Sequence, residues 1–320
     1  MRVEATGTVD YRKGKNMVFS THPDEKGKVI LQLGTADPDL ALKAAQTLEQ
    51  DVAGIDLNCG CPKKFSISGG MGAALLSDPE RLQKILENLV KHTSVPVSCK
   101  IRLLDTQEKT IELVKMIART GVSALTVHCR TREMRQSQKA QWERLREVVE
   151  AVKSVRDIPV IVNGDVFKRS DVEKVKELTG ADSAMIARGA QMHPSAFRKE
   201  GILSFHDTVR NYMKKAIDVD NIFQNSKYCI LCMNTEDSDH TRSDLYNNMQ
   251  RAKSTEVMCD VLGLREYYDK VQKEHKSKLE KVEKVEPTEE KAEEKAEEKS
   301  NKRSREVEEE FSEKKQKIDE

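Results

Sequence analysis

Between residues 29 and 187 short apolar runs alternate with helical patterns, and this alternation constrains the fold more than any other feature. The runs are rich in Val, Ile and Leu and show little polar alternation, which is typical of strands covered on both faces. Repeated strand–helix alternation favours a parallel sheet. The sequence therefore predicts an α/β fold with six parallel strands, at Val29–Leu33, Gly54–Leu57, Pro96–Leu103, Ala124–His128, Pro159–Val162 and Ser183–Ala187.

Helix signals fill the segments between these runs. Ser77 with Glu80, and Ser170 with Glu173, have the spacing of capping boxes. Pro38 and Pro79 stand where a first helical turn tolerates proline, and Gly121 stands where a helix would stop. These signals predict helices over residues 39–50, 82–90, 111–119 and 172–178.

Two parallel folds compete, an open doubly wound sheet and a closed barrel. The segment Leu33–Asp37 lacks the glycine fingerprint of the open dinucleotide-binding fold. Polar residues follow nearly every predicted strand, and a barrel brings all of these strand ends to one mouth. We therefore predict a (β/α)8 TIM-type barrel whose mouth carries Gln32, Asn58, Cys61, Lys100, Arg102, His128, Arg130, Asn163, Asp165 and Arg188.

A complete barrel has eight strands, and the sequence shows six. The loops 163–165 and 187–189 offer glycine N–H groups and a guanidinium, which suit the phosphate site that usually follows strands seven and eight. The absent strands would then be the first two, because residues 1–28 are too few to supply both. We expect an incomplete barrel, with strands three to eight present.

The predicted division of the chain has four parts. A polar segment with no clear strand or helix precedes the barrel, and a small helical domain follows it. The helices of that domain are expected at 206–217, 221–233 and 244–251, with a loop at 234–242. A tail rich in Lys and Glu, expected to be disordered or transiently helical, ends the chain. The four ranges are 1–28, 29–195, 196–270 and 271–320.

Composition excludes several classes of protein. The 320 residues are 37% apolar and 34% charged, with a net charge of +1, so no global basic field indicates a polyanion partner. No apolar run is long enough for a bilayer, and no metal-ligand spacing stands out, so neither a membrane nor a metal partner is expected. The seven scattered cysteines indicate reduced thiols in the cytosol or nucleus. Cys229 and Cys232 are interpreted as core packing.

The segment after the second predicted strand is the strongest candidate for chemistry. Pro62 cannot continue a strand ladder, so Cys61 lies on a loop at the strand tip. Gly69, Gly70 and Gly72 then indicate a backbone that turns tightly or lies close to another group. Free cysteines are often buried filler, and Cys59 keeps that interpretation. Loops on a rigid scaffold are where function concentrates, which favours a functional role for Cys61.

Five ordered motifs together resemble the tRNA-dihydrouridine synthases, flavin enzymes with a barrel and a C-terminal helical domain. The 63–76 loop is most similar to the eukaryotic tRNA-dihydrouridine(20) synthase branch. The resemblance runs from about Val29 to Tyr268. Its motifs are Asn-Cys-Gly-Cys-Pro (58–62) with the following glycine-rich loop, Cys-Lys-Ile-Arg (99–102), Val-His-Cys-Arg-Thr-Arg-Glu-Met-Arg (127–135), Val-Asn-Gly-Asp (162–165) and Ala-Arg-Gly-Ala (187–190).

This resemblance implies a role for each matching residue. Cys61 corresponds to the proton donor, since reduction of uridine adds hydride to C6 and a proton to C5, and a thiol is mostly protonated at neutral pH. Lys100 corresponds to the lysine against the flavin ring, where a cation stabilises the reduced form. Gln32 and His128 correspond to other flavin-facing positions. The ribityl-phosphate end of FMN would meet Asn163, Gly164, Asp165, Ala187 and Arg188.

The resemblance also implies NADPH as electron donor, tRNA as substrate, a monomer, and a cytoplasmic location. Basic clusters at 301–305 and 314–317 are either a nuclear address or a solvated charge run. The Ala-Pro-Met segment with which the family's first strand contacts FMN has no counterpart here. Several basic side chains are expected to contact RNA, although each could equally well be a solvated surface charge. They are Lys63, Lys64, Arg130, Arg132 and Arg135, with Arg210, Lys214 and Lys215 on the helical domain.

Two other functions stay open at this stage. A related flavin barrel acting on a free pyrimidine would use the same site, although arginines at the mouth favour tRNA. A truncated remnant that binds RNA without catalysis would lack flavin altogether. The flavin absorbance spectrum separates an enzyme from such a remnant.

Overall fold

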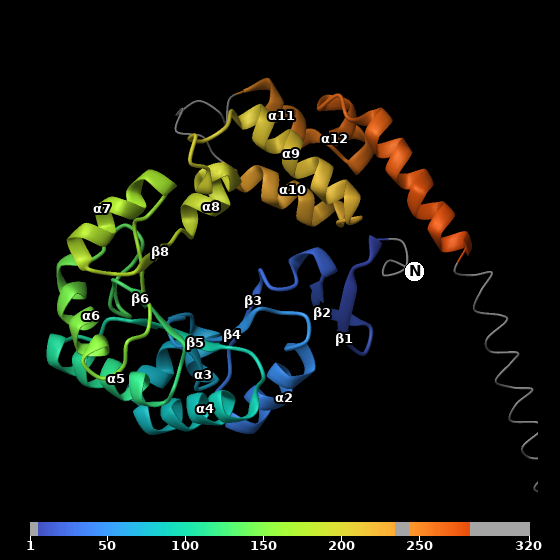
Figure 1. Ribbon diagram of the computed structural model, residues 1–320. Coiled ribbons are helices and arrows are strands. Elements are labelled where there is room, and N and C mark those ends of the chain that lie inside the picture. The colour runs from blue at the N-terminus through green and yellow to red at the C-terminus, as the bar shows by residue number, and fades with distance from the viewer. Residues whose placement is uncertain (1–5, 234–242, 282–320) are drawn as a thin grey trace, which may run out of the picture.

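A computed structural model describes residues 6–233 and 243–281 of the chain. Its main sheet has six parallel strands in the order in which they occur along the chain (Figure 1). A doubly wound sheet would reverse direction at a switch point, whereas a barrel adds strands in one direction. The observed order therefore fits part of a TIM barrel, as predicted. The strands are β3 (Ile30–Leu33), β4 (Gly54–Asn58), β5 (Val97–Arg102), β6 (Ala124–His128), β7 (Val160–Asn163) and β8 (Ser183–Met185).

Helices cover the outer face of this curved sheet (Figure 1). Their apolar stripes supply much of the core; Leu82, Ile85, Leu86 and Leu89, for example, are fully buried along one face of α4. The strands contribute apolar side chains, such as Ile55, to the same core. The covering helices are α2 (Pro38–Leu48), α4 (Pro79–His92), α5 (Gln107–Arg119), α6 (Leu145–Lys153) and α7 (Arg169–Thr179), with short turns η1 (Pro23–Glu25), η2 (Gly72–Ser77) and η3 (Trp142–Arg144).

The two faces of the sheet differ in polarity, which the apolar runs did not predict. Along β5 the side chains alternate between buried and partly buried, so only the outer face is uniformly apolar. The pairing register places polar residues opposite one another on the inner face: Asn58 opposite Lys100, and Arg102 opposite His128. Because β-strand side chains alternate every second residue, one face can pack on helices while the other lines the barrel interior.

Two predicted helix starts were displaced by one or a few residues. The N-cap of α4 is Asp78, whose carboxylate accepts from Arg81 N at 3.2 Å, and Ser77 makes no cap. Before α7 the carboxylate of Asp171 accepts from Phe167 N and Lys168 N, so the helix begins before Ser170. Carboxylates rather than serine hydroxyls accept these bonds, because an ionised acceptor bonds more strongly to N–H groups at a helix start.

The segment before β3 contains a hairpin that was missed in the sequence. Strands β1 (Val9–Lys13) and β2 (Asn16–Thr21) pair antiparallel and do not join the parallel sheet. Asp51, after α2, fastens the hairpin by accepting from Tyr11 Oη at 2.5 Å and Thr21 Oγ1 at 3.1 Å. Within the described residues β3 and β8 each pair with a single neighbour, so the sheet does not close.

After β8 the chain forms helices that arch back toward the hairpin (Figure 1). They have a hydrophobic cluster of their own, which includes Met213, Ile230 and Met258. From this separate cluster we propose that the helices after residue 196 form a domain distinct from the barrel part. The elements that follow β8 are α8 (Arg188–Met192), η4 (Pro194–Phe197), α9 (Phe205–Asp218), α10 (Phe223–Cys232), α11 (Asp244–Arg251), α12 (Thr255–Val261) and a helix over 265–281.

This last helix runs past residue 271, where the tail was expected to start. Residues 271–281 are helical, with Val271 and His275 buried, because they still contribute side chains to packing. The predicted loop 234–242, the rest of the tail and its basic clusters lie outside the described residues. Cys229 and Cys232 are only partly buried, so core packing does not fully describe them. No helix in the described ranges is long and apolar enough to cross a membrane.

Candidate active site

The inner face of the sheet opens into a cavity of about 330 Å³ at the C-terminal ends of β5 to β8. Seven of the predicted cofactor residues line it, which confirms that these strand tips converge. The lining residues are Lys100, Arg102, His128, Arg130, Met134, Gln136, Asn163, Gly164, Asp165, Val166, Phe167, Ala187 and Arg188. Four of them are cationic and one is a carboxylate, so the cavity favours an anionic ligand.

The single carboxylate of the cavity holds two arginines. Asp165 Oδ1 accepts from Arg130 Nη2 at 2.5 Å and from Arg188 Nη2 at 2.7 Å, and Oδ2 accepts from Ala140 N at 2.7 Å. Burial raises the pKa of Asp165, but these hydrogen bonds and the charge of Arg130 outweigh it, and the net shift is downward. The carboxylate therefore stays ionised and fixes both guanidinium groups at the cavity wall.

Lys100 is the cation in this cavity whose ammonium group has no hydrogen-bond or ion-pair partner among the described residues. Burial, followed by repulsion from Arg102, lowers its pKa to about 8, while attraction from Asp56 acts in the opposite direction. A partly buried lysine without a partner is costly unless a ligand pairs with it. Lys100 thus indicates where an electron-rich group would bind.

His128 is neutral at physiological pH. Burial, followed by repulsion from Lys100, Arg102 and Arg130, lowers its pKa to about 3. Its Nε2 lies 3.2 Å from Arg130 Nη1. Because a guanidinium can only donate, Nε2 must accept this bond, and the ring proton is therefore assigned to Nδ1. His128 can offer that N–H to a ligand.

Gly164 lets the backbone approach these side chains. Its φ is +113°, which side-chain-bearing residues rarely adopt. A Cβ at this position would lie 3.0 Å from Ala140 Cβ and 3.2 Å from both Arg130 Nη1 and His128 Cδ2. Asn163 precedes it and donates from Nδ2 to Met185 O at 3.0 Å, which ties the tip of β7 to β8. Ala187 is exposed at the rim.

Cys61 lies beside the cavity, on a loop that other residues hold in place. Asn58 Oδ1 accepts from both Gly60 N and Cys61 N at 3.0 Å, so the turn follows directly from the end of β4. Cys61 O accepts from Ala73 N at 3.0 Å. A Cβ at Gly72 would lie 2.8 Å from Cys61 O and 3.0 Å from Cys61 Cβ, so the glycine-rich segment packs directly on the cysteine.

Arg102 connects this loop to the cavity, and its role was not assigned from the sequence. Its Nε donates to Gly60 O at 2.7 Å and its Nη1 donates to Thr131 O at 2.9 Å. The side chain thus bridges the loops that follow β4 and β6 while lining the cavity from β5. The Cys-Lys-Ile-Arg spacing was the available signal, since residues 100 and 102 of one strand share a face.

A polar network on β3 to β5 supports the site from the side. Asp56 is 7% exposed; its carboxylate accepts from Gln32 Nε2 at 2.8 Å and Ser98 Oγ at 2.7 Å. Asn58 Nδ2 donates to Gln32 Oε1 at 2.9 Å. Gln32 is therefore on the inner face, as expected, but it is not among the residues that line the cavity. Its predicted contact with the cofactor stays a prediction.

The basic side chains predicted to contact RNA do not share one environment. Lys63, Lys64, Arg132 and Arg135 are exposed. Arg130 is 2% exposed, so it offers almost no surface to RNA, and its contact with RNA stays a prediction. Its Nε donates to Gln138 O at 2.7 Å, and the rest of its guanidinium serves Asp165 and His128. The sequence could not distinguish an arginine that points outward from one that folds back beneath its own loop.

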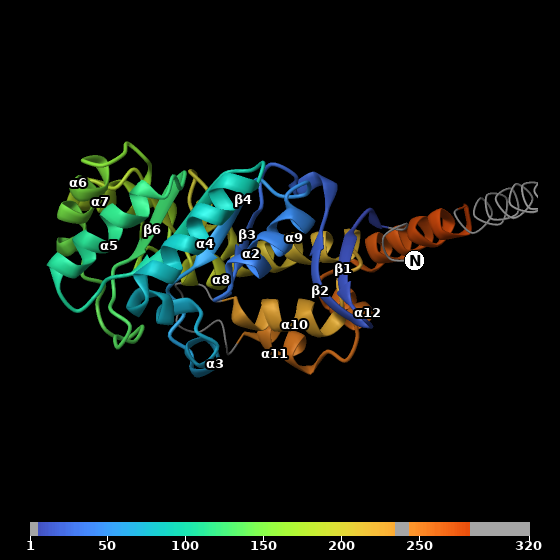
Figure 2. The same ribbon diagram turned by 90° about the horizontal axis from the view of Figure 1, so that it is seen from below.

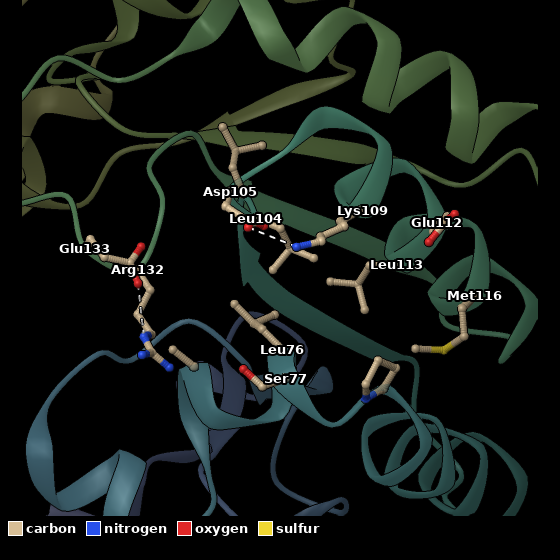
Figure 3. A pocket seen from close by; sticks show the side chains of 13 residues that line it. Leu76, Ser77, Leu104, Asp105, Lys109, Glu112, Leu113, Met116, Arg132 and Glu133 are labelled. Atoms are coloured by element: carbon tan, nitrogen blue, oxygen red, sulfur yellow. Dashed lines mark hydrogen bonds and ion pairs between the residues drawn. The ribbon is translucent and has the colours of Figure 1, made fainter.

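A larger cavity of about 620 Å³ lies elsewhere, between η2, α5 and the loop after β6 (Figure 3). Its wall is formed largely by aliphatic side chains, including Leu76, Leu104 and Met116. Charged residues at its rim pair with one another: Lys109 Nζ lies 3.0 Å from Asp105 Oδ2, and Arg132 Nε lies 3.4 Å from Glu133 Oε1. None of the predicted cofactor residues lines this cavity. Within the described residues no group of side chains is arranged to hold a metal ion.

We predict that Arg102→Lys loosens the loop that carries Cys61. Lysine keeps the charge but cannot donate to Gly60 O and Thr131 O in the same fixed geometry. Amide hydrogen exchange in residues 59–63 and 131–134 should accelerate in this variant. The matched control is Arg81→Lys, at an exposed arginine that pairs with Asp78 on α4. Equal exchange in Arg102→Lys and the wild type would show that Arg102 does not hold the loops.

Comparison with known proteins agrees with this geometry. The family model "Dihydrouridine synthase (Dus)" matches residues 3–315. The chain is 46% identical over 228 residues to a Schizosaccharomyces pombe protein named tRNA-dihydrouridine(20) synthase, covering 69% of this chain and 47% of the relative. It is 38% identical over 246 residues to the Saccharomyces cerevisiae protein of the same name, covering 71% and 64%. A Pectobacterium carotovorum protein named tRNA-dihydrouridine synthase B is 36% identical over 193 residues, 59% of each chain.

The chain thus spans about half to two thirds of the length of these curated relatives. It belongs to the dihydrouridine synthase family.

Proposed function

We propose that this chain reduces uridine to 5,6-dihydrouridine in tRNA, with FMN as bound cofactor, NADPH as electron donor, and the monomer as the active form. The observation that carries the proposal is the convergence of Lys100, His128, Asn163 and Arg188 on one cationic cavity, with the Cys61 loop fastened beside it through Arg102. The names of the relatives, which include tRNA, dihydrouridine and NAD(P)+, support it.

The residues of the cavity fit FMN. Lys100 supplies a partly buried cation that lacks a partner among the described residues, suited to an electron-rich ring. At the other end Arg188 and the loop at Asn163 and Gly164 supply donors and a guanidinium for a phosphate group. His128 offers its Nδ1 proton between them. When bound and reduced by NADPH, FMN would supply the hydride that is added to C6 of the pyrimidine.

Within this proposal, Cys61 completes the reduction by protonating C5. Addition of hydride at C6 leaves a pair of electrons at C5. The thiol transfers its proton to C5 and becomes a thiolate, so that the C5–C6 double bond becomes a single bond and two C–H bonds form. The thiol needs a fixed position to do this. Asn58 accepts from Cys61 N and Arg102 donates to Gly60 O, so together they fix the peptide group that joins Gly60 to Cys61.

The charge of Lys100 makes the proposed binding of FMN depend on pH. Its positive charge favours a ligand that is itself negatively charged, and its pKa of about 8 lies within the range where proteins are studied. Below pH 8 the ammonium form prevails, and above pH 8 the neutral amine does. Affinity for FMN should therefore fall as the pH rises through this value.

The experiment that tests the proposed function is Cys61→Ala. The variant should bind FMN as the wild type does, with the same flavin absorbance, because no cavity-lining atom is removed. Dihydrouridine formation in tRNA, followed by mass spectrometry of the nucleosides, should fall by about 10²-fold or more, as is usual when a general acid is removed. Cys229→Ala, at a partly buried thiol on α10, is the control.

Three results would contradict the proposal in different ways. Full activity of Cys61→Ala would remove the thiol from the reaction. Turnover of free uridine without turnover of tRNA would indicate a small-molecule reductase. A wild-type protein that takes up no FMN would contradict the cofactor assignment itself.

We predict that Lys100→Met abolishes the pH dependence of FMN binding near pH 8. Methionine has a similar length but no charge, so the variant should bind FMN weakly, and its affinity should not fall when the pH is raised from 7 to 9. Titration of flavin fluorescence at several pH values measures this. Lys109→Met on α5 is the control, because that lysine is exposed and pairs with Asp105. The same pH slope in Lys100→Met and wild type would exclude Lys100 as its source.

A further inference from the structure

We propose that Lys63, Lys64 and Phe65 form a platform at the start of α3 (Lys64–Ser68) on which one nucleobase of the RNA strand stacks, next to the reacting uridine. We call these three residues the α3 platform. The inference rests on the proposed function, since it identifies how the same site would take an RNA strand. None of the predicted RNA-contacting residues is aromatic, so Phe65 would add a stacking surface to them.

The first observation is the exposure of the Phe65 ring. Phe65 is 66% exposed, whereas the next residue, Ser66, is 3% exposed and Ile67 packs partly against the core. The helix therefore directs its inward positions to the protein and leaves the ring in solvent. Single exposed apolar side chains are common on protein surfaces, so exposure alone would not justify a binding role.

The second observation is that α3 is fixed to the same backbone as Cys61. A Cβ at Gly72 would lie 2.3 Å from Ser66 Oγ and 2.8 Å from Cys61 O, so Gly72 is wedged between the helix and the cysteine. Met71 N also donates to Ser66 O at 3.0 Å. A ring on a helix held in this way has a set position relative to the thiol. That is what a platform needs if it is to place a base reproducibly.

The third observation is the charge beside the ring. Lys63 and Lys64 are exposed, and the ammonium group of neither makes an ion pair or hydrogen bond with any of the described residues. Exposed Arg81, by comparison, is paired with Asp78. Two available ammonium groups beside an exposed ring match a strand in which phosphates alternate with flat bases. A protein partner that covered an aromatic side chain would have no comparable need for both charges.

The position of α3 suits such a strand. The helix projects from the body of the protein, to the same side as α10 and α11 (Figure 2). A strand whose uridine enters beside Cys61 would pass the α3 platform, because α3 begins three residues after that cysteine. Stacking is tolerant of sequence, since every base has a flat face. The platform would thus position the strand without selecting the base.

The test is steady-state kinetics and tRNA binding with Phe65→Leu and Phe65→Trp. Loss of one stacked base should raise KM and the Kd for tRNA by roughly 5- to 150-fold in Phe65→Leu. The kcat should change by less than about 2-fold, because stacking acts on binding before chemistry. Phe65→Trp should retain near wild-type values. Phe197→Leu, at a 54% exposed ring on η4, is the control and should change neither quantity.

The outcomes separate this inference from the proposed function. If the wild type forms dihydrouridine and Phe65→Leu keeps its KM and Kd while binding FMN normally, the α3 platform is wrong and the proposed function stands. If the Phe197→Leu control loses as much affinity as Phe65→Leu, the effect is not specific to α3 and the inference is also overturned. A wild-type protein that neither reduces nor binds tRNA would overturn both.

Discussion

The site depends on the two-residue repeat of six parallel strands. Because side chains alternate between the faces of a sheet, each strand can bury an aliphatic residue against the helices and present a polar one at the next position. Register then aligns the polar positions across strands, which is how Arg102 comes to lie opposite His128, and His128 opposite Asn163. A slip of one residue in any strand would send these side chains into the apolar layer.

Charge balance within the cavity gives each cation a different state. Asp165 binds Arg130 and Arg188 and holds them in place. Arg102 is used by two backbone carbonyls. Among the described residues only the Lys100 ammonium group in this cavity makes no hydrogen bond or ion pair. Burial, followed by the surrounding positive charge, lowers the pKa of Lys100 and the pKa of His128. The positive charge that is available to pair with a ligand therefore lies at one ammonium group, in the middle of the polar face.

Much of this architecture was predictable because it follows from local pattern. The apolar runs and helix caps were enough to predict six parallel strands, and the polar residues at the ends of β5 to β8 were enough to predict that these ends share one cavity. The hairpin at β1 and β2 was missed because it depends on a distant acceptor, Asp51. The burial of Arg130 and the bridging role of Arg102 were missed for a related reason. Both are set by where a long flexible side chain finds its partners, and sequence spacing does not encode that.

The proposed function requires that the polar face of this sheet bind one flavin, and a crystal structure of the chain soaked with FMN would show whether it does. We predict density for the ring against Lys100 and His128, with the phosphate near Asn163 and Arg188. Density for FMN in the cavity between η2 and α5, or an unchanged inner face at a saturating FMN concentration, would contradict the claim.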